Sequence, residues 1–553
     1  MNQSQSHIDS ATQQQARRAS RNLIGDALQR SVRRNPHKEA LRFGSRSWTY
    51  AQLDQAANRV AHRLLGLGLQ PGDRVAAYGR NSDAYIFLWL GCVRSGLIHV
   101  PVNYALIDSE LRYIVEQSGA RALFCDPDMA AHVQALAPAL ACAHEGTLYG
   151  GPGALDVLGW AQAPGADDAP ALDIDDEAIA QLLYTSGTTA APKGAMMSHR
   201  ALLAEYASTL VATDIRTSDR SLASLPLYHS AQMHVFLMPQ LLVGATTLLV
   251  QSPQTESCFA LIAAERVTSF FAPPTVWISF LRHPAFDASD LSSLQKGYYG
   301  ASIMPVPIVQ ELAARLPALQ LYNCYGQSEI APLATVLRPE DHAERPASAG
   351  RPIFNVETRI VDTGMQELPA GEMGEIVHRS PQLMSGYWNK PEETAATFAD
   401  GWFRSGDVGY FDAQGYLYIT DRIKDIIKTG GVVVSSREVE ECLYTHPAVA
   451  EVAVVGLPDD RWIEAVASIV SLKKCAEASE DELIAHARAH LAPFKVPKKV
   501  FFVDDMPRNA SGKLLKRELR RQYINAARKS LRGRPAPCPA CPACKFHLLR
   551  LPA

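Results

Sequence analysis

Apolar and polar residues follow one another along this chain with two different periods. Between residues 50 and 67 the apolar side chains recur at the spacing of one helix face, at Leu53, Ala56, Ala57, Val60, Ala61, Leu64 and Leu65. Residues 72–79, GDRVAAYG, have the continuous apolar character of a short buried strand. Helical and strand patterns then take turns, at residues 84–95, 98–101, 109–117 and 122–125. This alternation predicts an α/β fold with parallel-type sheets.

The pattern changes after Gly371, where short strands and turns dominate. A charged, turn-rich connecting segment lies at residues 420–425. After it, a compact α+β pattern occupies residues 435–443, 449–456, 465–472 and 480–491. About 100 residues are enough for a separate small domain. We therefore predict a large N-terminal domain with several subdomains at residues 22–423, and a small α+β C-terminal domain at residues 424–527.

Three stretches show neither period. Residues 1–21 are rich in Gln and Ser, and residues 528–553 are basic and then rich in Pro and Cys. We expect both ends to be disordered. Residues 146–170 are rich in Gly, Ala, Pro and Asp, which predicts a surface loop.

Composition excludes several classes of protein. The 553 residues carry 54 Lys and Arg against 57 Asp and Glu, and 47% are hydrophobic, which is ordinary for a globular protein and far from a collagen or a disordered chain. The net charge of −3 argues against nucleic-acid binding by bulk charge. The most apolar stretch, residues 235–250, is interrupted by Pro239, Gln240 and Gly244, so we expect no membrane-spanning helix. The polar N-terminus has no secretory pattern.

The positions of the cysteines bear on the cellular compartment and on a possible metal site near the C-terminus. Of ten cysteines, seven are scattered, which fits a reducing cytoplasm, so we expect a cytoplasmic protein. The other three, Cys538, Cys541 and Cys544, precede His547 and offer four potential zinc ligands. Their equal two-residue gaps do not match a zinc finger or ribbon. We expect a disordered tail here rather than a metal site.

The segment with the clearest chemistry is YTSGTTAAPKG, residues 184–194. Four hydroxyl residues and a glycine fill five positions, and a lysine follows; the candidates are Thr185, Ser186, Gly187, Thr188, Thr189 and Lys193. Hydroxyls and exposed backbone N–H groups can surround phosphate oxygens, and a lysine adds positive charge. The spacing is not that of a Walker A loop. By composition alone, an ordinary Ser/Thr-rich loop explains the segment equally well.

The full string resembles the phosphate-binding signature of the adenylate-forming superfamily, which includes acyl-CoA synthetases, luciferases and peptide-synthetase adenylation domains. Further matching segments follow in the family's order between about residues 49 and 519: LPLYHSAQ, NCYGQSE, GEIVHRSPQLMSGYWNKPEET, GWFRSGDVGYFDAQGYLYITDRIKDIIKTGG and PRNASGK. The resemblance implies a ligase that uses ATP, Mg²⁺ and CoA. It would convert a carboxylic acid to acyl-AMP with release of pyrophosphate, and then transfer the acyl group to CoA.

The resemblance also implies roles for single residues. Glu329 would help to hold Mg²⁺, and Asp407 would accept hydrogen bonds from the ribose hydroxyls. Arg422 would bind ribose or phosphate near the domain junction. The remaining nucleotide- or CoA-binding candidates are Gly300, Ala301, Ser302, Asn323, Tyr325, Gly326, Ser328, Lys428, Gly430 and Gly431.

Three residues are expected to control the reaction. Lys513 would bridge the substrate carboxylate and the α-phosphate, which repel each other as anions. Lys424 resembles the hinge about which the small domain rotates between the two half-reactions. His229, in the "PLYH" segment, would line the entrance for the acid. Taken alone, each of these side chains is also consistent with an ordinary surface or structural role.

Two positions depart from the family pattern. Ala190 stands in the phosphate loop, and Ile463 stands between Trp462 and Glu464, where the family usually has glycine. If Ala190 needs a positive φ, the cost is about 1 kcal/mol. Neither change alters the expected class of enzyme.

The substrate follows from the stretches expected to line the acid site. They are apolar or aromatic, and include Tyr228, Ala231, Met233, Phe236, Phe271, Trp277, Tyr298 and Tyr299. Such a lining suits an aliphatic or an aromatic tail. The segments LPLYHSAQMHVFLMP and GGVVVSSREVE resemble those of bacterial medium- or long-chain fatty acyl-CoA ligases, and this resemblance favours a fatty acid, with an aryl acid of the benzoate or coumarate type as the alternative. Two further alternatives are an acyl-AMP ligase that loads a carrier protein and a degenerate member that only binds ligands. The sequence leaves open the oligomeric state, a homodimer included, and docking on membranes.

Overall fold

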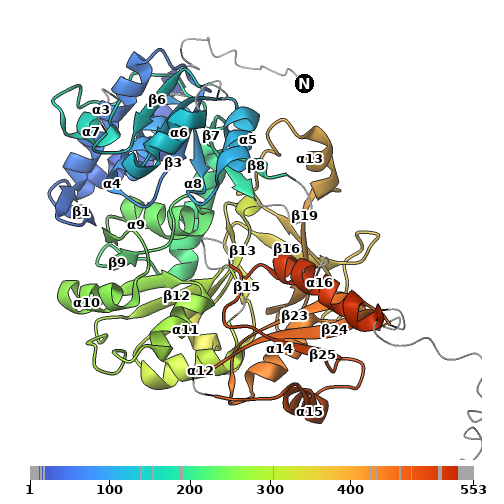
Figure 1. Cartoon of the computed structure of the whole chain (residues 1–553). Coiled ribbons are helices and arrows are strands. Elements are labelled where there is room, and N and C mark those ends of the chain that lie inside the picture. The colour runs from blue at the N-terminus through green and yellow to red at the C-terminus, as the bar shows by residue number, and fades with distance from the viewer. Residues whose placement is uncertain are drawn as a thin grey trace, which may run out of the picture. The chain divides into compact units, whose positions relative to one another are not determined.

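The computed structural model of the chain (Figure 1) describes residues 12, 15–16, 19–136, 140, 142–151, 155–185, 191–302, 304–422, 425–429, 432–459, 462–474, 476–508 and 514–532. The side chains of Val433 and of residues 525–532 are not part of this description. The chain divides into two compact units. Unit 1 is Met1–Thr420 with Arg508–Lys513, and unit 2 is Asp421–Pro507 with Leu514–Ala553.

The first sheet of unit 1 has the strand order β6-β5-β3-β4-β7-β8. Its strands are β3 (Arg74–Tyr78), β4 (Ile98–Val102), β5 (Ala120–Cys125), β6 (His144–Thr147), β7 (Ile179–Thr185) and β8 (Lys193–Ser198). All neighbouring pairs are parallel except β7 and β8. The helices of this part of unit 1 are α2 (Ile24–Arg34), α3 (Tyr50–Gly66), α4 (Asp83–Ser95), α5 (Asp108–Ser118), α6 (Ala130–Leu136), α7 (Val157–Gln162) and α8 (His199–Thr213).

Local sequence explains why these helices start and stop where they do. At Thr49 the side chain accepts a hydrogen bond from the Gln52 N–H, and the Gln52 side chain accepts one from the Thr49 N–H, which forms a capping box for α3. Ser82 caps α4, which ends at Gly96 in the left-handed conformation. Every residue of α4 is buried, because the helix is apolar on most sides and lies in the centre of the core.

The second sheet of unit 1 has the order β15-β14-β13-β12-β11-β9-β10-β1-β2. Its strands are β1 (Glu39–Phe43), β2 (Arg46–Thr49), β9 (Arg220–Ala223), β10 (Thr246–Leu249), β11 (Ser269–Ala272), β12 (Lys296–Gly300), β13 (Gln320–Gly326), β14 (Leu333–Leu337) and β15 (Arg351–Pro352). The associated helices are the π-helix η3 (Ala231–Leu237), α9 (Met238–Val243), α10 (Thr255–Glu265), α11 (Pro274–Arg282), α12 (Val306–Arg315) and the short turns η4 (Ser328–Ile330) and η5 (Pro339–Asp341).

A third sheet contains β16 (Glu357–Val361), β17 (Gly374–Arg379), β18 (Phe398–Ala399), β19 (Trp402–Phe411) and β20 (Leu417–Arg422), with α13 (Pro391–Thr397) before β18. The pairs β16–β17, β17–β19 and β18–β19 are antiparallel. This agrees with the change of pattern that the sequence shows after Gly371.

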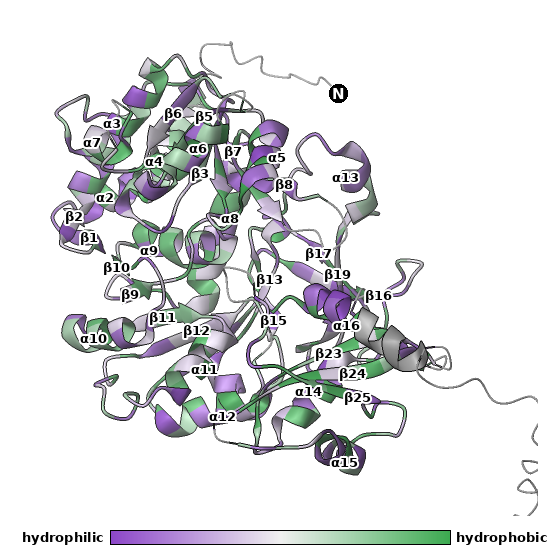
Figure 2. Cartoon of the chain, in the orientation of Figure 1, coloured by the Kyte–Doolittle hydropathy of each residue, from purple (hydrophilic) through white to green (hydrophobic). Residues whose placement is uncertain are grey.

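Unit 2 is an α+β fold around a sheet of order β22-β21-β24-β23, with β25 paired to β24. Its elements are β21 (Ile427–Thr429), β22 (Val432–Val434), α14 (Ser436–Tyr444), β23 (Val449–Asp459), β24 (Ile463–Leu472), α15 (Glu480–His490), β25 (Lys499–Phe502) and α16 (Lys516–Arg532). Figure 2 shows β23 and β24 as largely hydrophobic and the coloured, N-terminal part of α16 as largely hydrophilic. The apolar side of α16, with Leu519 fully buried, packs against β23.

The predicted fold class, a large α/β N-terminal part and a small α+β C-terminal part, is confirmed. One local expectation is wrong. The segment 146–170 is not a plain loop, because it contains α7, whose Val157, Trp160 and Ala161 are buried. A helix of six residues is too short for its period to stand out among Gly and Pro. The helix α16 continues to Arg532, and the disordered tail expected at residues 528–553 stays a prediction.

A few residues near the N-terminus are helical. Thr12, Ala16 and Ser20 are helical, and the Ser20 hydroxyl donates a hydrogen bond to the Ala16 carbonyl, within the segment 1–21 expected to be disordered. Among the described residues, no helix is both long and apolar enough to cross a membrane. The domain limits 22–423 and 424–527 and the cytoplasmic location stay predictions.

Candidate functional site

The predicted phosphate loop joins two antiparallel strands at one end of the first sheet. β7 ends at Thr185, β8 begins at Lys193, and these two residues are directly paired. Because β7 runs parallel to β4, this end is the carboxyl edge at which α/β sheets commonly bind ligands. Ser186, Gly187, Thr188, Thr189 and Ala190 lie outside the described residues. Thr185 and Lys193 thus stand at the two ends of the loop.

Lys193 and Glu329 contact the same tyrosine. The Lys193 ammonium lies 4.1 Å from the centre of the Tyr387 ring, a cation–π geometry. The Tyr387 hydroxyl donates a hydrogen bond of 2.9 Å to Glu329 Oε1. Burial raises the pKa of Tyr387, and the neighbouring Glu329 carboxylate raises it further, so the phenol stays protonated and remains a donor.

The backbone holds this tyrosine in place. Gly386 accepts a hydrogen bond from the Met196 N–H at 2.9 Å, and the Trp388 N–H donates to Gly194 at 2.8 Å, so residues 386–388 extend along β8. The Met384 N–H donates to the carbonyl of Glu329 at 2.9 Å. The segment therefore ties the loop strand β8 to the turn η4 that carries Glu329. The Glu329 carboxylate is a ligand of the kind that a hard cation such as Mg²⁺ prefers, and it lies in a segment tied to the strand that carries Lys193.

His229 lies close to the same turn through its neighbours in the chain. The hydroxyl groups of Ser230 and Ser328 are 2.9 Å apart, which joins the "PLYHS" segment to η4. Tyr228 packs edge-to-face against Tyr104 at 5.6 Å and against the His229 ring at 6.5 Å. His229 itself is half-buried. The predicted site residues Ser328, Glu329 and His229 thus come from adjacent segments.

Asp407 is held by two side chains of the adjacent YGQSE segment. Its Oδ2 accepts a hydrogen bond of 2.8 Å from the Tyr325 hydroxyl and one of 2.9 Å from the Gln327 amide. The Asp407 backbone N–H donates to Ser405 Oγ at 3.0 Å. Asp407 is 4% exposed. These donors fix the orientation of the buried carboxylate. A fixed orientation suits a group that accepts hydrogen bonds from a ligand.

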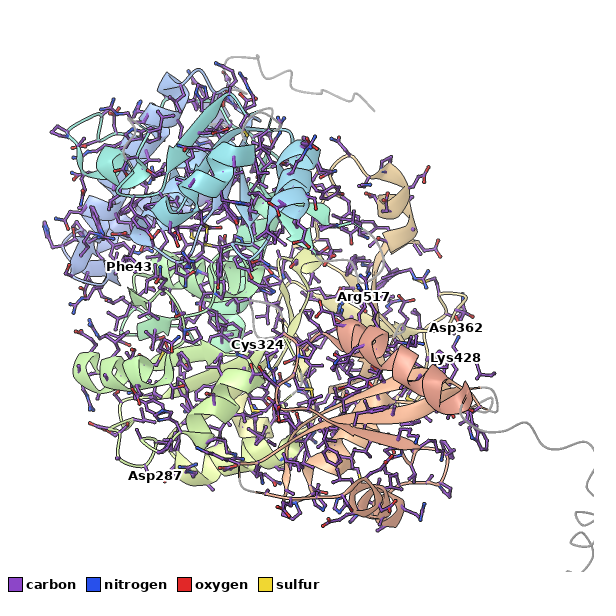
Figure 3. All side chains as sticks on the ribbon, in the orientation of Figure 1. Phe43, Asp287, Cys324, Asp362, Lys428 and Arg517 are labelled. Carbon is purple, nitrogen blue, oxygen red and sulfur yellow. The ribbon has the colours of Figure 1, made fainter. Side chains whose placement is uncertain are left out.

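Close backbone contacts account for the small residues at this edge. A Cβ on Gly300 would lie 2.2 Å from the Cys324 carbonyl oxygen of the neighbouring strand, and a Cβ on Gly326 would lie 1.8 Å from the Pro332 carbonyl oxygen. Figure 3 labels Cys324 on β13. Ala301 follows β12 with φ +63° and is exposed, with Ser302 half-buried beside it. The Asn323 amide donates to the Ser348 carbonyl at 2.8 Å. Packing against neighbouring backbone thus requires glycine at positions 300 and 326, and their role in nucleotide binding stays a prediction.

Unit 2 carries the remaining described candidates. The Arg422 N–H donates to Asp421 Oδ1 at 2.8 Å, while Asp421 Oδ2 accepts from the N–H and the hydroxyl of Ser436 at 2.7 and 2.8 Å. The Lys428 side chain is exposed (Figure 3), and its N–H donates to Glu464 Oε2 at 2.8 Å. Lys424, Gly430, Gly431, Lys513 and the Cys538–Cys541–Cys544–His547 tail lie outside the described residues.

Three of the aromatic residues expected to line the acid site, Phe236, Phe271 and Tyr298, pack against one another. The Phe236 and Phe271 rings stack at 4.2 Å, and Phe236 also contacts Tyr298 at 5.0 Å. Tyr298 donates to the Thr213 carbonyl, and Trp277 donates to the Tyr298 carbonyl. Met233, Phe236, Phe271, Trp277, Tyr298 and Tyr299 are at most 3% exposed, whereas Tyr228 and Ala231 are half-buried.

Sequence reasoning missed two residues of this arrangement. Tyr387 joins Lys193 to Glu329, and Gln327 holds Asp407, yet neither was assigned a role. Both lie inside the segments on which the resemblance rests, MSGYW and YGQSE. Their place inside these segments was the signal that could have drawn attention to them. Their roles depend on long-range contacts that a single sequence does not display.

Comparison with known proteins covers nearly the whole chain. Residues 28–388 match the family described as AMP-binding enzyme, and residues 438–513 match the AMP-binding enzyme C-terminal domain. A feruloyl-CoA synthase of Amycolatopsis sp is 38% identical over 501 residues, which are 90% of this chain and 99% of that protein. The long-chain-fatty-acid–CoA ligase FadD13 of Mycobacterium tuberculosis is 35% identical over 478 residues, 86% of this chain and 93% of that protein.

A solved structure is similar at the level of the whole fold. The anthranilate CoA ligase AuaEII in complex with anthranoyl-AMP is 28% identical, with a TM-score of 0.84. The similarity covers 92% of this chain and 98% of that one.

Proposed function

Because the chain belongs to the family of AMP-binding enzymes and is an AMP-forming acid–CoA ligase, we propose that it activates a compact aromatic acid of the hydroxycinnamate class. The acid carboxylate attacks the α-phosphorus of ATP, an aryl acyl-AMP forms and pyrophosphate leaves. The CoA thiol then attacks the acyl carbon, the thioester bond forms, and AMP leaves.

The packing of the aromatic residues favours a compact acid. Phe236, Phe271 and Tyr298 fill the region around η3 with their own rings and are buried. Extending a long alkyl chain through that region would require these rings to separate, at the cost of their mutual contacts. The whole-length similarity to a feruloyl-CoA synthase supports the same class of acid. The packing of these three rings is the observation that carries the proposal.

The described residues divide the work of the first half-reaction. Lys193 and Thr185, at the ends of the loop, would contact the phosphates of ATP, and Asp407 would accept hydrogen bonds from the ribose. Glu329 would hold Mg²⁺, which screens the phosphate charge when it is bound. Tyr387 is a positioning residue that keeps Lys193 and Glu329 together. Lys513 would bring positive charge to the reacting carboxylate and α-phosphate, and Lys424 would be the hinge for the second half-reaction.

A panel of acids tests the proposed substrate class. We expect kcat/KM for CoA thioester formation with ferulate or coumarate to exceed that with octanoate or palmitate by at least about tenfold, equivalent to about 1.4 kcal/mol of transition-state binding. A preference for palmitate of the same size would replace the aryl acid with a fatty acid.

A fatty acid is the second candidate, and the similarity to FadD13 supports it. A third possibility, loading of a carrier protein, differs in its second step. It predicts acid-dependent ATP–pyrophosphate exchange without consumption of CoA, whereas the proposed ligase shows this exchange and also consumes CoA.

A further inference from the structure

Unit 2 contains a cluster of three metal-binding side chains that acid–CoA ligation does not use. Cys442 lies in the last turn of α14, and His486 and His490 lie one turn apart on α15. One donor atom from each side chain, the Cys442 sulfur and a nitrogen of each imidazole, lies within 4.8 Å of the other two. We propose that these residues bind a divalent transition metal of the zinc class.

The spacing fits such a metal after a small movement of the side chains. A tetrahedral zinc with bonds of about 2.3 Å to sulfur and about 2.0 Å to nitrogen holds its ligands roughly 3.3–3.7 Å apart. The donors therefore need to approach one another by about 1.5 Å at most. His490 is exposed, His486 is half-buried and Cys442 is buried, so the site is accessible from the histidine side. The fourth position is left to water.

Backbone carbonyls already hold both imidazole rings. One nitrogen of His486, Nε2, is 3.2 Å from the Cys442 carbonyl oxygen and 2.8 Å from the Thr445 hydroxyl. Nδ1 of His490 is 2.8 Å from the His486 carbonyl oxygen. Carbonyl partners of this kind orient the histidines of metal sites. The planes of the two rings are tilted by 41° to each other, with their centres 4.6 Å apart.

The electrostatic setting favours a cation. Both α14 and α15 end at this cluster, at Tyr444 and His490, and the carboxyl ends of helices carry partial negative charge. His446 lies beside the His486 ring at 5.1 Å, and its Nε2 is 3.5 Å from Glu482 Oε1. That carboxylate adds negative charge next to the cluster without occupying it.

The choice of ligands sets the chemical class of the metal. A thiolate with two imidazoles selects zinc, cobalt, nickel or copper over Mg²⁺, which prefers oxygen. The site is therefore separate from the magnesium expected at Glu329. Because its ligands come from two helices, a bound metal links α14 to α15 and stabilises unit 2.

Cobalt titration of the full-length chain tests the site, because a thiolate bound to Co²⁺ has a characteristic charge-transfer absorption. The chain is first treated with a chelator and then titrated with Co²⁺ in excess Mg²⁺. Matched variants are Cys442→Ser, His490→Asn and a tail variant with Cys538, Cys541 and Cys544 all changed to Ser. Acid-dependent ATP–pyrophosphate exchange checks that each variant is folded.

We expect the thiolate–cobalt absorption to remain in the tail variant, to disappear in Cys442→Ser and to need at least about tenfold more Co²⁺ in His490→Asn. Exchange activity should stay at the wild-type level in all three. Absorption that is lost only in the tail variant, or that is unchanged in Cys442→Ser, would overturn the proposal, as would the absence of any cobalt binding by the folded wild-type chain.

Discussion

The hydroxyl of Tyr387 donates a hydrogen bond of 2.9 Å to Glu329 Oε1, while the face of the same ring lies 4.1 Å from the Lys193 ammonium. One tyrosine thus fixes the distance between the cation expected to bind phosphate and the carboxylate expected to bind Mg²⁺. The two charges come from segments more than a hundred residues apart in the sequence.

Tyr387→Phe should slow adenylation while leaving the fold intact. The variant keeps the ring beneath Lys193 but loses the hydrogen bond to the Glu329 carboxylate, which is of a kind that contributes about 1.5–3 kcal/mol. We expect the rate of ATP–pyrophosphate exchange to fall by about 10- to 100-fold. Tyr410→Phe, on β19, is the matched control and should keep the wild-type rate. Equal rates for Tyr387→Phe and wild type would show that the hydrogen bond does not position Glu329.

Tyr325→Phe should weaken ATP binding more than it slows chemistry. The Asp407 carboxylate would keep the Gln327 amide and lose the Tyr325 hydroxyl as a donor. We expect KM for ATP to rise by about 5- to 10-fold with kcat within about a factor of two, as for lost binding that is the same in ground and transition states. A drop in kcat at unchanged KM would instead place Tyr325 in the chemical step.

Ile463→Gly should stabilise unit 2. Ile463 has φ +70° and its residue surface is 70% exposed, so a β-branched side chain holds a left-handed conformation with little burial in return. Glycine relieves a backbone strain of about 1–2 kcal/mol. It also loses more conformational entropy on folding, which costs about 0.5–1 kcal/mol, so the net gain in folding stability is roughly 1 kcal/mol.

Hydrogen exchange in β23 and β24 of the full-length chain measures this gain. Ile463→Ala is the matched control, since it removes the branch and keeps the Cβ, and should fall between wild type and glycine. Faster exchange in Ile463→Gly than in wild type would contradict the expectation.

His378→Gln should reduce the loss of stability at acidic pH. Burial lowers the pKa of His378 to about 3 from the usual 6.5. The unfolded chain therefore binds a proton that the folded chain does not, so this residue's contribution is present above about pH 6.5 and is lost as pH falls towards 3. The slope is up to about 1.4 kcal/mol per pH unit.

Urea unfolding between about pH 4 and pH 7 measures this effect. The free energy of unfolding should fall less steeply with acid in His378→Gln than in wild type. Parallel pH profiles would mean that His378 is not buried in its neutral form.

Much of the fold could be predicted from the sequence because its strongest patterns are local. The helix over residues 50–67 and the strand within 72–79 match α3 and β3, since capping residues and apolar spacing define them within one segment. The family was predictable because its motifs keep their order along the chain, and the matches over residues 28–388 and 438–513 confirm it. The short helix α7 was missed, because its burial depends on contacts with α3 and α4 and not on its own period.

The residue types of the candidate site could be inferred from the motifs, but the contacts among these residues could not. Glu329, Asp407 and Lys193 stand out from motifs, whereas the roles of Tyr387 and Gln327 arise from side-chain contacts between distant segments. The consequence of Ile463 also needed the structure. The sequence shows only that glycine is replaced, and the backbone shows that the position is left-handed.

Product analysis of a single reaction tests the central claim most directly. The full-length chain is mixed with ATP, Mg²⁺ and ferulate, first without and then with CoA. The account predicts feruloyl-AMP and pyrophosphate in the first step, and feruloyl-CoA and AMP after CoA is added. Formation of ADP and phosphate, or an acyl-AMP that persists when CoA is present, would contradict it.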